Sequence, residues 1–90
     1  MKSKARVVLY TKTNCSLCEK MKAQIKLANC DELYSLEEVD IERDAELFAR
    51  YRYEIPVLSI NGHDAFRYRL TAGDFRRAIQ KVSAQGSAIS

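Results

Sequence analysis

The sequence predicts a single α/β domain with the element order β-α-β-α-β-β-α, folded as a mixed four-stranded sheet flanked by helices. Short β-branched or aromatic runs alternate with runs whose apolar residues recur every three or four positions. An Asn-Gly pair separates the last two β-type runs, and ninety residues suffice for one small domain. We place this domain at residues 1–83 and expect residues 84–90 to form a flexible tail.

The first strand and the first helix are predicted near the amino terminus. Residues 6–10, RVVLY, form a β-branched and aromatic run that ends at the polar sequence TKTN, which is typical of a buried strand followed by a loop. The helix is predicted to start at about Cys15, because the apolar residues beyond it are spaced four, four and three positions apart. These apolar residues are Leu17, Met21, Ile25 and Ala28.

A second strand and a second helix are predicted in the middle of the chain. In residues 35–41, SLEEVDI, alternate positions share one face of an extended chain. Residues 43–53 follow a helical pattern, with an acid near the start and arginines near the end, as the helix dipole favours. The apolar side of this helix consists of Leu47, Phe48 and Tyr51. We expect the first two strands to be parallel and joined by a right-handed crossover.

The carboxyl-terminal part predicts a hairpin and a last helix. Asn61-Gly62 lies between the strand-like runs 56–60 and 64–70, which predicts two antiparallel neighbours. His63 falls in this turn, where we expect it to be solvated. Thr71 is a candidate helix cap with an acid three residues later. The helical pattern that follows consists of Phe75, Ala78, Ile79 and Val82.

Composition and charge narrow the range of function classes. The net charge of +3 comes from 15 basic and 12 acidic residues spread along the chain, so no basic face for nucleic acid is indicated. No segment is long enough to span a bilayer, and the amino-terminal apolar stretch is too short for a secretory signal. Three cysteines without a signal peptide favour a reducing compartment. We therefore expect a cytoplasmic monomer that binds neither nucleic acid nor membrane.

Cys15 and Cys18, separated by two residues, are either a metal clamp or a redox couple. A closed zinc site needs four ligands, and the chain offers only these two, Cys30 and His63. On a continuous helix Cys30 lies on the order of 18 Å beyond Cys18, since each residue adds about 1.5 Å. This geometry places the redox interpretation ahead of a metal site, and Cys30 is then an inert, partly buried thiol.

The position of the pair on the first helix assigns a role to each sulfur. Cys15 stands at the helix amino terminus, where unpaired N–H groups and the helix dipole favour a thiolate. Such a position lowers a cysteine pKa from about 8.5 into the range of roughly 3.5 to 7.5. Cys18 lies on the same helical face, one turn inside and within reach of a disulfide. We predict that Cys15 attacks and that Cys18 resolves.

These motifs together resemble the glutaredoxin family of the thioredoxin fold, over about residues 5–82. The segment YTKTNCSLC resembles the active-site segment of the family, and IPVLSING resembles the segment that begins with its cis-proline. The resemblance implies a thioredoxin-like fold, a cis bond before Pro56, and pairing of the Ile55 backbone with an extended thiol substrate. Lys12 is a candidate to add positive potential or to bind a substrate carboxylate; its alternative is an ordinary solvated loop lysine. The positions on the active-site pattern are Tyr10, Thr11, Lys12, Thr13, Cys15 and Cys18.

The chain also departs from the family pattern. Ser16 and Leu17 stand where glutaredoxins usually have proline and an aromatic residue. The segment AFRYRLTAGDF lacks the glycine pair that, in the family, opens the last helix and helps to hold glutathione. We therefore expect glutathione to be a poor ligand. Arg67 and Arg69, alternating with apolar residues on the last strand, are either a partial replacement for that site or solvated edge charges.

The leading functional hypothesis is a thiol-disulfide oxidoreductase that reduces disulfides of small or protein substrates. It needs no bound cofactor, and its electron donor is a reductase or glutathione. One alternative is a carrier of metal or iron–sulfur clusters in which two chains contribute thiolates, although CSLC does not resemble the monothiol motif of such glutaredoxins. The other alternative is a binding module that keeps the fold without turnover.

Overall fold

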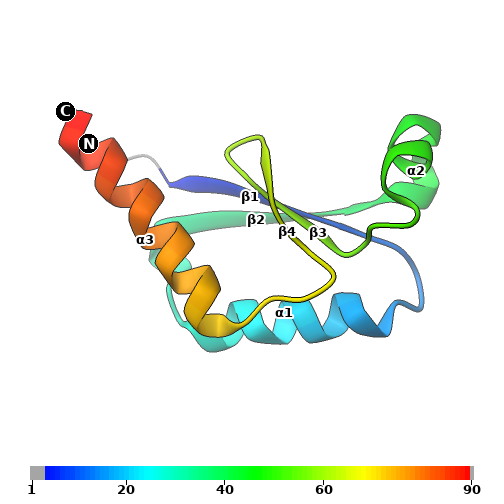
Figure 1. The fold of residues 1–90 in the computed structure, drawn as a ribbon, viewed down its shortest axis with the longest axis horizontal. Coiled ribbons are helices and arrows are strands. Elements are labelled where there is room, and N and C mark those ends of the chain that lie inside the picture. The colour runs from blue at the N-terminus through cyan, green and yellow to red at the C-terminus, as the bar shows by residue number, and fades with distance from the viewer. Residues whose placement is uncertain (1–3, 90) are drawn as a thin grey trace.

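A four-stranded sheet organises the fold of the computed structural model, which describes the backbone of residues 4–89 and the side chains of residues 4–82. The elements follow the predicted order (Figure 1). They are β1 (Ala5–Thr11), α1 (Ser16–Ala28), β2 (Tyr34–Asp40), α2 (Ala45–Tyr51), β3 (Val57–Ile60), β4 (His63–Arg67) and α3 (Ala72–Ile89), with 3₁₀ turns at Asp31–Leu33 and Ile41–Arg43. The predicted mixed α/β fold is confirmed.

The strand order β2-β1-β3-β4 puts the first strand at the centre of the sheet. β1 and β2 are parallel, as predicted, whereas β1 with β3 and β3 with β4 are antiparallel. In this register Tyr10 lies opposite Val57, so the carboxyl end of β1 adjoins the amino end of β3. The loop after β1 and the loop before β3 therefore meet at one end of the sheet.

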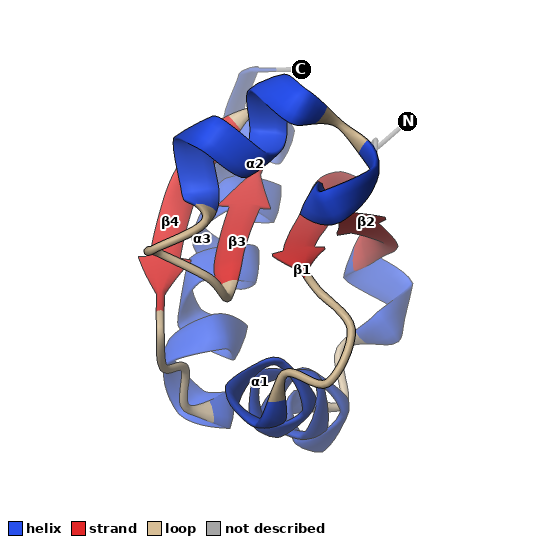
Figure 2. Ribbon diagram, turned by 90° about the vertical axis from the view of Figure 1, so that its right-hand side faces the viewer, coloured by secondary structure: helices blue, strands red, loops and turns tan. Residues whose placement is uncertain are grey.

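Helices α1 and α2 lie on opposite sides of the sheet (Figure 2). The larger core cluster joins α1 and α3 to the sheet through Leu9, Met21, Ile25, Phe75 and Ile79, each at most 1% exposed. α2 covers the other face through a smaller cluster around Tyr51, whose ring stacks on Tyr10 with centroids 4.5 Å apart. Burial of these apolar side chains on both faces holds the cysteine-bearing helix against the sheet.

The predicted hairpin between β3 and β4 is present. Asn61 and Gly62 have positive φ angles of 51° and 85°, as a two-residue turn of this kind requires. The Asn61 side chain also accepts a hydrogen bond from the Arg6 amide at 2.8 Å, which ties the turn to β1. His63, the first residue of β4, is exposed, as expected.

The prediction that the last strand extends over residues 64–70 is wrong at its carboxyl end. β4 ends at Arg67, because Tyr68 adopts a left-handed conformation with φ of 67°. This break ends the alternation: Leu70 is buried, but Tyr68 is 47% exposed. Arg67 and Arg69 therefore do not share one face of a strand, contrary to expectation.

The last helix extends beyond the apolar pattern that predicted it. α3 runs from Ala72 to Ile89, and the Thr71 hydroxyl caps it by accepting from the Asp74 amide at 3.1 Å. The side chains of residues 83–90 lie outside the described part of the chain. The flexibility expected of residues 84–90, and the domain boundary at residue 83, stay predictions. Within residues 4–89 no helix combines the length and the apolar character needed to cross a membrane.

Candidate redox site

Cys15 is the N-cap residue of α1. Its backbone is extended, with φ of −104° and ψ of 104°, and its Sγ atom accepts a hydrogen bond from the Cys18 amide at 3.2 Å. The polar loop before it turns at Asn14, which has a positive φ of 60°. The sulfur therefore lies against the unpaired amides and the positive end of the helix dipole, where a negative charge is stabilised.

Cys15 and Cys18 are joined by a disulfide, with Cα atoms 5.2 Å apart, a usual separation for such a bond. The two residues differ in accessibility, since Cys18 is fully buried while Cys15 is half-buried. Asn14, Ser16 and Glu19 surround Cys15 in a shallow surface depression. The pair is thus at bonding distance, with one residue open to solvent and the other in the core.

The Ile55–Pro56 peptide bond is cis, as the resemblance implied. Pro56 is buried at the start of β3, and its carbonyl accepts from the Tyr68 amide at 2.8 Å. Because Tyr10 pairs with Val57, this segment adjoins the end of β1 that leads into the cysteine loop. The Ile55 amide donates to the Tyr51 carbonyl at 3.2 Å. Backbone pairing of Ile55 with a substrate stays a prediction.

Lys12 lies in the loop between β1 and α1, on the amino-terminal side of Cys15. Its side chain is exposed and forms no ion pair with the described residues. The loop thus presents a cation that no acid of the described chain neutralises. Its predicted contact with the thiolate or with a substrate carboxylate stays a prediction.

Arg67, a candidate glutathione contact, is already paired with carboxylates of the chain itself. Its Nε atom donates to Glu54 at 2.6 Å and its Nη2 atom to Asp64 at 3.4 Å. Asp64 also accepts from the Tyr51 hydroxyl at 3.2 Å. The pKa of Tyr51 is raised, mainly by burial and further by the Asp64 charge. Arg67 therefore belongs to a polar network on the α2 side.

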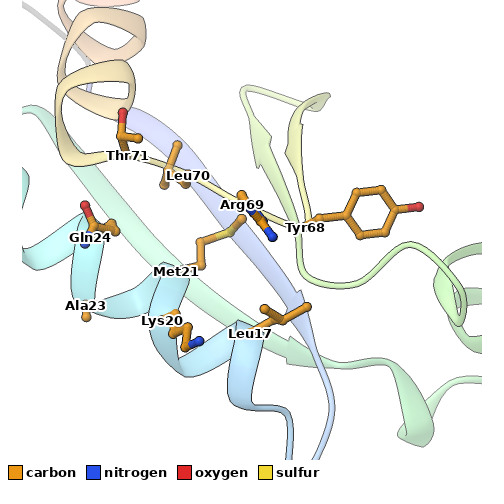
Figure 3. A pocket seen from close by; sticks show the side chains of 9 residues that line it. All are labelled: Leu17, Lys20, Met21, Ala23, Gln24, Tyr68, Arg69, Leu70 and Thr71. Carbon is orange, nitrogen blue, oxygen red and sulfur yellow. The ribbon is translucent and has the colours of Figure 1, made fainter.

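Arg69 instead lines a groove that the sequence did not predict (Figure 3). The groove has a volume of about 580 Å³ and lies between α1 and residues 68–71. α1 contributes one helical face, in which each residue recurs three or four positions from another. The α1 residues are Leu17, Lys20, Met21, Ala23 and Gln24.

The amino terminus of α3, at the end of this groove, is capped by side chains. Gln24 Oε1 accepts from the Ala72 amide at 3.0 Å, and the Thr71 hydroxyl accepts from the Asp74 amide. In the glutaredoxin family this helix start helps to hold glutathione. Here two of its amides already have partners within the chain, and poor glutathione binding stays a prediction.

Cys30 lies beyond the other end of α1 and is a buried free thiol. Burial raises its pKa, and the nearby Arg76 opposes this effect in part. Among the residues whose side chains are described, no three His, Cys, Asp or Glu residues cluster so as to hold a metal ion. The structure thus brings Cys15 and Cys18 together and keeps Cys30 as a core residue.

Known proteins share this architecture. A structural genomics target protein from X. campestris matches with a TM-score of 0.72 at 23% identity, covering 83% of this chain and 96% of its own. A protein from Nitrosomonas europaea matches with a TM-score of 0.73 at 22% identity, over 87% and 94% of the two chains. A chloroplastic thioredoxin z matches with a TM-score of 0.70 at 18% identity, over 90% and 80%.

At these identities the structural matches establish the thioredoxin-like fold, in which a cysteine pair at bonding distance supports a redox function. The family is established by sequence, because the family model described as Glutaredoxin-like domain (DUF836) matches residues 6–83, which include both cysteines and Pro56. The chain is therefore a member of this glutaredoxin-like family, and its fold is thioredoxin-like.

Proposed function

We propose that this chain is a thiol-disulfide oxidoreductase that reduces disulfides of small or protein substrates through the Cys15–Cys18 pair. The observation that carries the proposal is the hydrogen bond from the Cys18 amide to Cys15 Sγ, at the start of α1. The same contact favours the thiolate of Cys15 once the pair is reduced. The difference in accessibility between the two cysteines supports one attacking and one resolving sulfur.

In the first step the Cys15 thiolate attacks one sulfur of the substrate disulfide. A new bond forms between Cys15 Sγ and that sulfur, the substrate S–S bond breaks, and the departing thiolate takes a proton from water. The product is a mixed disulfide between the protein and half of the substrate. Lys12, next to this step in the loop, supplies positive potential or binds a substrate carboxylate.

In the second step Cys18, as a thiolate, attacks Cys15 Sγ. The mixed disulfide breaks, the second substrate thiol leaves, and the internal disulfide forms. Two electrons have then passed from the protein dithiol to the substrate. The backbone of Ile55 beside Pro56 aligns the substrate during both steps. Glutathione or a reductase returns the electrons in the cytoplasm.

A single-turnover reaction tests this function. The reduced protein, freed of reductant, is mixed with hydroxyethyl disulfide, which is small and uncharged. We expect the protein to lose two hydrogens in mass while mercaptoethanol is released. Cys15→Ser should release none, whereas Cys30→Ala, which removes the thiol outside the pair, should react as the wild type does. Release of mercaptoethanol by Cys15→Ser at the wild-type rate would contradict the proposal.

A further inference from the structure

The groove between α1 and residues 68–71 begins at Leu17, two residues after Cys15, and neither cysteine lines it. Its first residue, Leu17, stands between the two cysteines in sequence, and its last α1 residue is Gln24 (Figure 3). Gln24 stands seven positions after Leu17 on the helix, a length of about 10 Å. An extended chain advances roughly 3.3 Å per residue, so about three residues next to a substrate cysteine fit along the groove.

The groove combines an exposed apolar entrance with a buried apolar floor. Leu17 is 39% exposed, whereas Met21 and Leu70 are almost fully buried beneath it. In Figure 3 the ring of Tyr68 points away from α1. The groove thus offers apolar contact at Leu17, two residues after Cys15, and a cation on its far wall.

The charged residues of the groove are both cations. Lys20 on α1 and Arg69 on the opposite wall line it, no carboxylate does, and neither cation forms an ion pair with the described residues. The amides of Ala72 and Asp74 at the nearby helix start already have acceptors within the chain. Lys20 and Arg69 are therefore the charged groups in the groove that can receive a carboxylate.

The groove on the other flank of α1 differs in its charged residues. The groove there includes acidic residues, and Lys22 is held between Glu19 at 2.8 Å and Glu38 at 3.2 Å. These two carboxylates, Glu19 most strongly, raise the pKa of Lys22. Three carboxylates, of Glu19, Asp31 and Glu38, thus line that flank beside Lys22 and Lys26, whereas the flank that adjoins residues 68–71 has two cations and no carboxylate.

We propose that this groove binds an acidic segment, about three residues long, next to the reactive cysteine of a protein substrate. Leu17 contacts an apolar side chain of the segment, while Lys20 and Arg69 bind its carboxylates. The proposal rests on the oxidoreductase function and adds a class of substrate to it. Opposite charges across such an exposed contact mainly raise the rate of association.

Two peptides of equal length test the proposal. Each carries one cysteine as its mixed disulfide with mercaptoethanol. In the acidic peptide this cysteine is followed by Leu and two Glu, and in the basic peptide by Leu and two Lys. The rate constant for reaction with the reduced protein is divided by the rate constant with dithiothreitol, which removes intrinsic differences in reactivity. We expect the acidic peptide to react roughly three- to tenfold faster at low salt, the range expected of two exposed ion pairs. The ratio should approach one in high salt.

Charge reversal distinguishes the groove from the net charge of the protein. The double variant Lys20→Glu, Arg69→Glu should prefer the basic peptide. Arg6→Glu, Lys26→Glu changes the net charge equally at sites outside the groove and should keep the acidic preference. The control variant Arg6→Glu, Lys26→Glu should also react with hydroxyethyl disulfide as the wild type does.

Each remaining outcome decides against one of the two proposals. Equal rates for the two peptides, or a preference that the first double variant leaves unchanged, would overturn the acidic-segment proposal. A wild-type protein that fails to react even with uncharged hydroxyethyl disulfide would instead overturn the oxidoreductase function.

Discussion

The amide of Cys18 donates a hydrogen bond to the Sγ atom of Cys15 at 3.2 Å, and this contact makes Cys15 the cap of its own helix. An N-cap side chain usually supplies an oxygen that accepts from one of the first helical amides. Here sulfur takes that position, so the group that caps α1 is also the proposed nucleophile. Reduction of the disulfide leaves this sulfur where a thiolate is favoured over a thiol.

Alkylation of the reduced protein should therefore follow the order of thiolate stability and exposure. We expect iodoacetamide to modify Cys15 first as the pH rises, because its sulfur is accessible and stabilised as an anion. Cys30 should react last, at a pH above that of an ordinary thiol, since burial raises its pKa. Peptide mass mapping after timed labelling measures the order, and earlier modification of Cys18 or Cys30 would reverse the assignment.

Arg76 on α3 should contribute to stability through the end of the cysteine-bearing helix. Its Nε and Nη2 atoms donate to the Ala28 carbonyl at 2.9 and 2.7 Å. We expect Arg76→Ala to lower the free energy of unfolding by about 1 to 2 kcal/mol, measured with urea, because the charged donor is lost. Arg77→Ala is the matched control: it breaks only an exposed pair with Asp74, which is expected to be worth about 0.5 kcal/mol. Equal losses in the two variants would show that the contact with Ala28 has no special weight.

Oxidised glutathione should bind weakly. The Gln24 side chain accepts a hydrogen bond from the Ala72 amide at the start of α3, and Arg67 is paired with Glu54 and Asp64. Calorimetric titration of the Cys15→Ser variant, which prevents exchange, should give a Kd well above about 10 μM. Arg69→Ala should weaken this binding further, whereas Arg67→Ala should leave it unchanged. If the Cys15→Ser variant without further changes binds oxidised glutathione with a Kd of about 10 μM or below, the capped helix start still accepts glutathione.

The features that the sequence predicted correctly depend on neighbouring residues. Asn61-Gly62 specifies its turn by the φ angles that these two residues tolerate, and Thr71 specifies a helix start by capping an amide three residues away. The apolar spacing after Cys15 likewise marks the helix that holds the cysteine pair. Such signals act within one turn of the chain and can be read without knowing the rest of the fold.

The features that the sequence did not predict depend on distant contacts. Tyr68 has a left-handed backbone conformation, and its amide donates a hydrogen bond to the Pro56 carbonyl. The strand ends there, so the alternating sequence pattern around Tyr68 predicted the wrong strand end. Gln24 meets Ala72 across 48 residues, and this contact only exists once α1 and α3 are packed. The groove beside the cysteines is a product of the same packing, which explains why Lys20 carried no signal in the sequence.

The central claim, that Cys15 attacks and Cys18 resolves, is tested most directly by trapping the intermediate. The Cys18→Ser variant is reduced, mixed with hydroxyethyl disulfide and analysed by mass spectrometry of the intact protein and its peptides. We predict one mercaptoethanol adduct, located on Cys15 and stable until dithiothreitol is added, because the resolving thiol is absent. An adduct on Cys30 alone, or no adduct under conditions in which the wild-type protein forms its internal disulfide, would contradict the mechanism.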